Sequence, residues 1–128
     1  MKAIIIAITV AIVLIGSALA LARGGVSLTD SIPANNVSVV DGKQIIEIRA
    51  KGGYQPRRSI AKAGIPTIIR FNTSGTFDCS SSVRIPSLGI NKVLPQTGTT
   101  DIDIGSQQVL TLQGMCGMGM YPFEIEFQ

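Results

Sequence analysis

Residues 101–104, Asp-Ile-Asp-Ile, and residues 124–127, Glu-Ile-Glu-Phe, alternate strictly between charged and apolar side chains. Successive side chains of a β-strand point to opposite faces, so this period of two predicts strands with one face in water and the other in a core. Short stretches rich in β-branched residues recur between turn residues along the chain. The predicted strands cover residues 37–40, 44–50, 67–71, 82–85, 92–94, 100–104, 108–113 and 122–127.

Turn residues separate these stretches, and Asp41-Gly42 between the first two is a tight-turn dipeptide. No stretch after residue 36 carries a helical stripe of apolar residues. Several short strands at this spacing predict an all-β domain over residues 37–128, folded as a Greek-key β-sandwich or barrel.

The amino-terminal segment has a different character. Residues 3–22 form an apolar run interrupted only by Thr9, Gly16 and Ser17. A helix of this length reaches about 30 Å, which matches the hydrocarbon core of a bilayer. We therefore expect one transmembrane helix that anchors the chain. A cleaved secretory signal is the alternative, because Ala20-Leu21-Ala22 fits a signal-peptidase site.

Residues 23–36 are rich in Gly, Ser, Pro and Asn and predict a linker between anchor and domain. The amino terminus and Lys2 precede the apolar run, whereas Arg23 alone follows it closely. By the positive-inside rule, this difference of about one charge gives a weak bias toward a domain outside the cell and leaves the side open.

The net charge of +3 does not indicate a nucleic-acid partner, because no nucleic-acid-binding motif accompanies it. After residue 23 the chain carries nine basic and eight acidic residues. Basic residues gather between positions 49 and 62, which predicts a solvated edge of the domain. Contact with lipid headgroups or with an acidic partner surface is the alternative.

Sulfur-containing side chains are concentrated near the carboxy terminus. The chain has two cysteines, Cys79 and Cys116, and residues 115–120 read Met-Cys-Gly-Met-Gly-Met. Glycines contribute no packing but let the backbone turn tightly, so the sulfur atoms can converge on one point. Thiolates and thioethers are soft ligands that select Cu(I). The sequence therefore predicts a Cu(I) site made of sulfur ligands.

The chain contains no histidine, and a blue-copper electron-transfer centre needs two imidazole ligands. Binding of Cu(I) for transfer or storage is therefore favoured over electron transfer, and we expect no enzymatic activity. Two structural alternatives stay open. Cys79 and Cys116 can form a disulfide that staples the domain in an oxidising compartment, and the methionines can simply fill the end of a sandwich.

Several short motifs together resemble a known family. They are Gly52-Gly53-Tyr54-Gln55-Pro56, residues 63–67, Cys79, Ile85-Pro86, Leu94-Pro95 and the Cys-x-Met-x-Met motif at Cys116, Met118 and Met120. With the amino-terminal anchor, they make the chain similar to the family of membrane-anchored Cu(I) chaperones with a cupredoxin-like domain. Related domains occur in copper-exporting P-type ATPases.

The resemblance implies a site for two Cu(I) ions, with Cys79 and Cys116 as thiolate ligands and Met118 and Met120 as thioether ligands. Met115 is a further candidate outside the motif. The resemblance also implies transfer of copper to a copper-exporting P-type ATPase, copper resistance, and a domain at the cytoplasmic face of the membrane. A copper sensor or a copper-insertion accessory outside the cytoplasm, and a redox protein with an unusual centre, are the remaining functional alternatives.

Overall fold

The structure is a computed structural model that describes residues 1–22 and 35–128 of the chain. The amino-terminal helix and the β-domain belong to separate compact units, and each is described by itself. The predicted linker, residues 23–36, lies outside the described residues except for Asn35 and Asn36.

A single helix, α1 (Lys2–Ala22), occupies the amino-terminal segment, as the sequence predicts. The hydroxyl of Thr9 donates to the carbonyls of Ile5 and Ile6, so this polar group is satisfied within the helix. Within the described part of the chain, no helix meets the length and hydropathy needed to cross a membrane. The helix is confirmed, whereas its insertion into a membrane stays a prediction.

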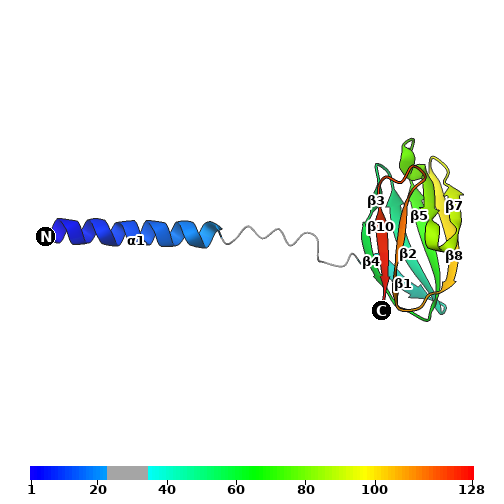
Figure 1. Cartoon of the computed structure of the whole chain (residues 1–128), viewed down its shortest axis with the longest axis horizontal. Helices are drawn as coiled ribbons and strands as arrows, with labels where there is room; N and C mark the ends of the chain where they lie inside the picture. Colours follow the sequence, from blue (N-terminus) through cyan, green and yellow to red (C-terminus); the bar gives the residue numbers. More distant parts are fainter. Residues whose placement is uncertain (23–34) are drawn as a thin grey trace. The chain divides into compact units, whose positions relative to one another are not determined.

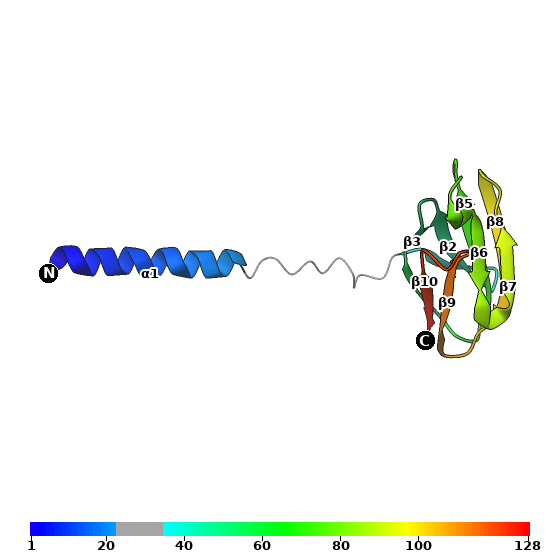
Figure 2. The ribbon, with the colours of Figure 1, turned by 45° about the horizontal axis from the view of Figure 1, so that its top comes forward.

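Residues 35–128 form a sandwich of two five-stranded sheets (Figures 1 and 2). The first sheet contains β1 (Val37–Val40), β2 (Lys43–Ala50), β3 (Tyr54–Gln55), β5 (Pro66–Thr73) and β8 (Gly98–Ser106). The second contains β4 (Arg58–Ala61), β10 (Phe123–Phe127), β9 (Leu110–Cys116), β6 (Ser82–Ile85) and β7 (Ile90–Val93). Two short 3₁₀ turns, η1 (Cys79–Ser81) and η2 (Pro86–Leu88), flank β6.

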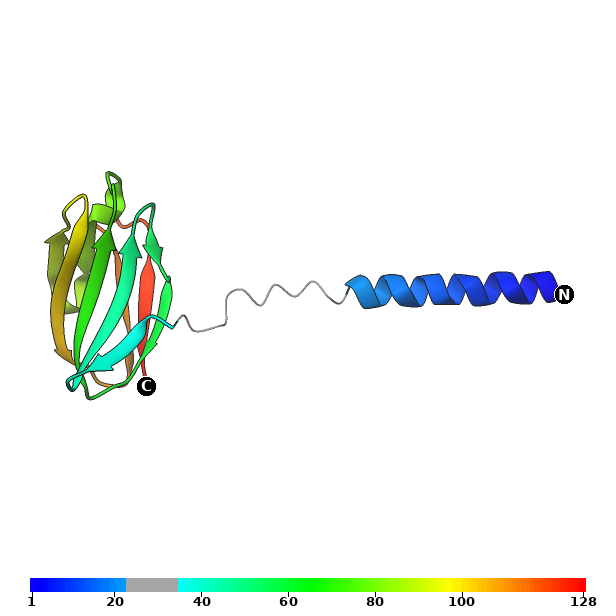
Figure 3. The same ribbon diagram turned by 180° about the vertical axis from the view of Figure 1, so that it is seen from behind.

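Two of the strand pairs are parallel, β2 with β5 and β4 with β10, and the others are antiparallel. Figure 3 shows β2, β5 and β8 side by side in the first sheet. The β2–β5 register places Ile48 beside Phe71. Both side chains are buried, so this pair contributes directly to the core.

Alternation along the strands builds the core as the sequence predicts. In β10, Ile125 and Phe127 are buried, while Glu124 and Glu126 face outward and pair with Arg58. Burial of each large apolar side chain stabilises the fold by roughly 1.5–3 kcal/mol. Other large buried side chains include Ile46, Ile48, Ile69, Phe71, Val83, Ile85 and Leu112. The prediction of an all-β sandwich is confirmed.

Two strands, β3 and β4, were not predicted. Tyr54–Gln55 is too short to show a period. In β4 the side chains that point inward are the small Ser59 and Ala61, whereas Ile60 is only half-buried. The hydrophobic pattern of this strand is therefore weak, although it pairs with β10 over four residues.

The strand directions bring four loops to one end of the sandwich. Strands β2, β5, β7 and β9 end there, and the strands that follow them begin there. We call this the cysteine end; it comprises residues 51–53, 74–81, 94–97 and 117–122. The Asp41-Gly42 turn and the carboxy terminus lie at the opposite end.

Candidate metal centre at the cysteine end

The fold brings the two cysteines together from distant parts of the chain. Cys79 begins η1, Cys116 ends β9, and their Cα atoms lie 5.7 Å apart across a sequence separation of 37 residues. In the structure the two sulfur atoms form a disulfide. Cys116 has no exposed surface, whereas Cys79 is half-buried.

This disulfide is the structural alternative that the sequence left open. A bonded pair offers no thiolate, so the disulfide must be reduced before the two cysteines can bind Cu(I) as thiolates. The role of Cys79 and Cys116 as metal ligands stays a prediction. The fold does bring the two sulfur atoms to one place, which that role would need.

Asp78 fixes the turn that carries Cys79. Its carboxylate caps η1 by accepting hydrogen bonds from the Ser80 N–H at 3.1 Å and from the Ser80 hydroxyl at 2.7 Å. The Gly52 N–H, in the β2–β3 loop, donates to the same carboxylate at 3.2 Å. One side chain therefore links two loops of the cysteine end.

These hydrogen bonds also determine the ionisation of Asp78. Burial tends to raise its pKa, but the hydrogen bonds from Ser80 and Gly52 stabilise the carboxylate, and the net pKa lies below the ordinary value. The carboxylate in turn affects Tyr54. Burial of the phenol, and secondly the negative charge of Asp78, hold the pKa of Tyr54 well above its ordinary value.

Tyr54 lies between the candidate site and the aromatic core. Its hydroxyl donates to the Ser82 carbonyl at 3.1 Å, and its ring packs edge-on against Phe71 and Phe123, with centroid distances of 6.0 and 4.9 Å. The Gly117 N–H donates to the same Ser82 carbonyl at 2.9 Å. Tyr54 thus connects the aromatic core to the first residue after Cys116.

Residues 117–120 form a closed turn. The Cys116 N–H donates to the Met120 carbonyl and the Gly119 N–H to the Cys116 carbonyl, both at 2.9 Å. Gly119 has φ of +77°, where a side chain is disfavoured, and a Cβ on Gly117 would lie 2.6 Å from the Ser82 hydroxyl oxygen. The expectation that these glycines permit a tight turn is confirmed.

Met118 and Met120 lie on this turn with their side chains largely in solvent. Met118 is 81% exposed and Met120 is 53% exposed. They do not fill a core, because they bury too little of their surface. Two accessible thioethers thus lie within four residues of the buried sulfur of Cys116.

Met115 is directed elsewhere. Alternation along β9 places Gly114 and Cys116 toward the core and Met115 on the outer face of the sheet. There its side chain lines a shallow groove of about 290 Å³ together with Pro86 and Gln113. Met115 is therefore separated from the cysteine pair.

Gly114, which the sequence analysis did not single out, shapes the same strand. A Cβ at this position would lie 2.1 Å from the Phe123 ring, so only glycine allows the ring to cover β9 beside Cys116. Tyr54 and Asp78 were also missed. Tyr54 falls within the resemblance motif, but its contact with Ser82 spans 28 residues and has no local signal.

The candidate metal-binding groups of this end are sulfur atoms. Among the described residues, no group of three or more His, Cys, Asp or Glu side chains could hold a metal ion. Any metal here would be bound by two thiolates with thioether support. This is a donor set for Cu(I) and not for Zn²⁺, which prefers closed tetrahedral sets of Cys and His.

Two solved structures have a similar fold. One, described as a copper binding protein in the apo form, is 24% identical, with a TM-score of 0.66, covering 72% of this chain and 94% of its own. The other is the metal binding domain of the Cu(I) exporting P-type ATPase CopA of Streptococcus pneumoniae D39, with Cu(I). It is 25% identical, with a TM-score of 0.65, covering 72% of this chain and 92% of its own.

No curated protein matches the chain. The family model described as "Cupredoxin-like domain" matches residues 5–125, which is most of the sequence. Together with the two-sheet sandwich, this match assigns the chain to the family of cupredoxin-like domains.

Proposed function

We propose that this protein binds Cu(I) as cargo through Cys79, Cys116, Met118 and Met120, and passes it to a copper-exporting P-type ATPase. One observation carries the proposal: the fold joins two distant cysteines beneath a turn that holds two thioethers in solvent. The likeness to the metal binding domain of a Cu(I) exporting ATPase supports it. No catalytic step is part of this function.

The arrangement suits a carrier. The exposed side of Cys79 lets a second protein's sulfur approach, so the acceptor can bind copper before the first ligands release it. The exposed thioethers can move, since no core packing fixes them. Copper held by two thiolates and by thioethers of this kind can therefore be exchanged between proteins. The proposal includes a site for one or two Cu(I) ions, and the titration counts them.

The experiment is an anaerobic Cu(I) titration of the reduced full-length protein in neutral detergent, in competition with a chromophoric chelator. We expect the protein to take one or two copper ions from the chelator. The variants Cys79→Ser and Cys116→Ser should lose this binding, and Met115→Leu should retain it. Because Cys116 is fully buried, circular dichroism must first show that its variant is folded; the half-buried Cys79 gives a second, milder variant.

A disulfide-stapled structural sandwich is the second candidate, because the structure contains that bond. The bond closes a loop of 37 residues, and crosslinks of this kind contribute about 2–4 kcal/mol of stability. If the reduced protein leaves all copper with the chelator and its melting temperature falls by many degrees on reduction, the structural role is the better account.

We also propose that α1 anchors the protein in a membrane, as its apolar sequence suggests. The described apolar side chains of α1 are exposed, so the helix has no protein core of its own. The bonded cysteines favour an oxidising compartment outside the cytoplasm, whereas a Cu(I) carrier that serves an exporter belongs inside. Reporters fused after Gln128 would identify the side. An outside location would replace the exporter with a sensor or copper-insertion role.

A further inference from the structure

Exposed apolar side chains gather at the cysteine end. Phe77 is 78% exposed, Met118 is 81% exposed and Tyr121 is 36% exposed. Phe77 precedes Cys79 by two residues, and Met118 follows Cys116 by two residues. The disulfide between the two cysteines therefore keeps the two loops that carry Phe77 and Met118 close together. Aromatic and methionine side chains are enriched at protein interfaces.

Two cations border these apolar groups. The Lys51 amino group and the Phe77 ring both approach Gly75, each 3.9 Å from where its Cβ would lie. Arg57 and Tyr121 line the same cavity of about 160 Å³. Within residues 35–128, neither Lys51 nor Arg57 forms an ion pair, whereas Lys43, Arg58 and Arg70 each do.

Negative charge offsets these cations only in part. Asp78 is the one acidic residue in the loops of the cysteine end, and its carboxylate accepts hydrogen bonds from Ser80 and Gly52, so one negative charge stands against the two cations. Glu124, the next acidic residue along β10, is 3.4 Å from the Arg58 guanidinium. The surface around the sulfur pair is therefore apolar with a basic border.

We propose that the cysteine end is a docking surface for a protein that presents a copper-accepting cysteine motif surrounded by acidic side chains. Phe77, Met118 and Tyr121 would supply the apolar contact, while Lys51 and Arg57 would pair with the carboxylates of the acceptor. This inference rests on the proposed function, because it names the partner of the same site. Opposite charges at such a border mainly accelerate encounter and set orientation.

The test uses two synthetic peptides with the same Cys-x-x-Cys motif, one flanked by glutamates and the other by lysines. Both are titrated into the reduced, copper-free, full-length protein labelled with ¹³C at the methionine methyl groups. We expect the acidic peptide to shift the Met118 and Met120 signals at low salt and to leave Met115 unchanged. The basic peptide should bind at least about threefold more weakly, the scale expected for a few exposed ion pairs.

Charge reversal then locates the contact. Lys51→Glu and Arg57→Glu should each weaken binding of the acidic peptide by about threefold, the scale expected for the loss of an exposed ion pair. Lys62→Glu makes the same change at the opposite end of the sandwich and should have no effect. The preference for the acidic peptide should fade as salt is raised, because exposed charges are screened.

Equal binding of the two peptides, or an equal effect of Lys62→Glu, would overturn the proposal. The outcome is independent of copper, since the peptides are tested on the copper-free protein. If the protein takes up no Cu(I) yet binds the acidic peptide at this end, the docking surface stands and the carrier function fails. If it binds Cu(I) but does not prefer the acidic peptide, the carrier function stands and the docking surface fails.

Discussion

The end of β9 and the turn that follows it are neighbours in sequence but differ in almost every physical respect. Cys116 has no exposed surface, and the Phe123 ring covers the strand beside it at Gly114. Two residues later, Met118 is 81% exposed. The difference indicates that core packing fixes the position of Cys116, whereas the thioethers of the turn have no packing that fixes them. A carrier that must hold copper and also release it needs both properties.

The largest effect should come from removing the close packing at the end of β9. In Gly114→Ala the new methyl group would meet the Phe123 ring at 2.1 Å, so the ring or the strand must move. We expect a loss of about 3 kcal/mol in the free energy of unfolding, measured by urea denaturation. Gly119→Ala is the matched control: its Cβ would meet nothing within 4 Å, but φ of +77° costs about 1 kcal/mol. Equal losses in both variants would mean that packing does not distinguish the two regions.

Substitutions of the methionines in the turn should have the opposite effect: they should change stability little and should clearly lower Cu(I) affinity. Replacing both Met118 and Met120 by leucine should lower Cu(I) affinity by at least about tenfold in the chelator competition. The free energy of unfolding should change by less than about 0.5 kcal/mol, because both side chains are largely exposed. Met115→Leu, on the outer face, should change neither quantity. Unchanged affinity in the double variant would remove the thioethers from the site.

Asp78 fixes the turn that carries Cys79, the partner of Cys116, and the effect of replacing it should depend on pH. Because the pKa of Asp78 in the folded protein lies below its ordinary value, ionisation stabilises the fold. That stability is complete above the ordinary pKa of about 4 and is lost as pH falls through the lowered value. Asp78→Asn should therefore cost about 1 kcal/mol at pH 7 and progressively less in acid.

Unfolding curves at pH 7 and pH 3 would measure this difference. Asp41→Asn, in the turn at the opposite end, provides the control, since asparagine tolerates its left-handed φ of 51°. A cost of Asp78→Asn that stays constant with pH would show that the hydrogen bonds, and not the charge, account for its contribution.

The fold was largely predictable because its core depends on a period of two. Residues 101–104 and 124–127 show that period directly, and β10 buries the expected side chains. Strand β4 was not predictable in this way. Its inward residues, Ser59 and Ala61, are small, so parallel pairing with β10 identifies the strand more clearly than its own sequence does.

The meeting of the two cysteines was predictable, whereas the geometry around them was not. With two cysteines in the chain, any site that uses both must bring Cys79 and Cys116 together, and the structure does so. The predicted strand ended at residue 113 because glycine is disfavoured in strands, whereas β9 continues to Cys116. Gly114 lies within the strand because Phe123 needs the space, and this long-range contact decides that Met115 faces away from the cysteines.

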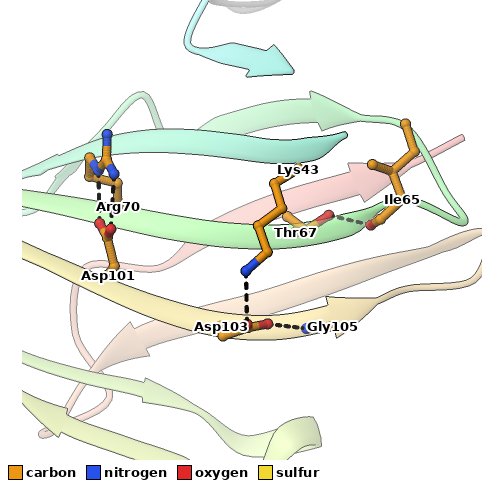
Figure 4. Close-up of polar contacts among 7 residues, drawn as sticks. All are labelled: Lys43, Ile65, Thr67, Arg70, Asp101, Asp103 and Gly105. Carbon is orange, nitrogen blue, oxygen red and sulfur yellow. Dashed lines mark hydrogen bonds and ion pairs between the residues drawn. The ribbon is translucent and has the colours of Figure 1, made fainter. Parts of the chain in front are cut away.

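The smallest effect should come from an ion pair far from both regions. On the outer face of the first sheet, the Arg70 guanidinium donates to both carboxylate oxygens of Asp101, at 2.8 and 2.9 Å (Figure 4). The Arg70 and Asp101 side chains are 32% and 42% exposed, so water and salt screen their attraction. Arg70→Met should lower the melting temperature by only about 1–2 °C, and Cu(I) affinity and acidic-peptide binding should stay unchanged. Loss of peptide binding in this variant would mean that the positive charge of the whole domain, and not the two cations that border the cysteine end, Lys51 and Arg57, attracts the partner. A surface cation is informative about function only where it has no partner and lies beside the reactive sulfur, and Arg70 meets neither condition.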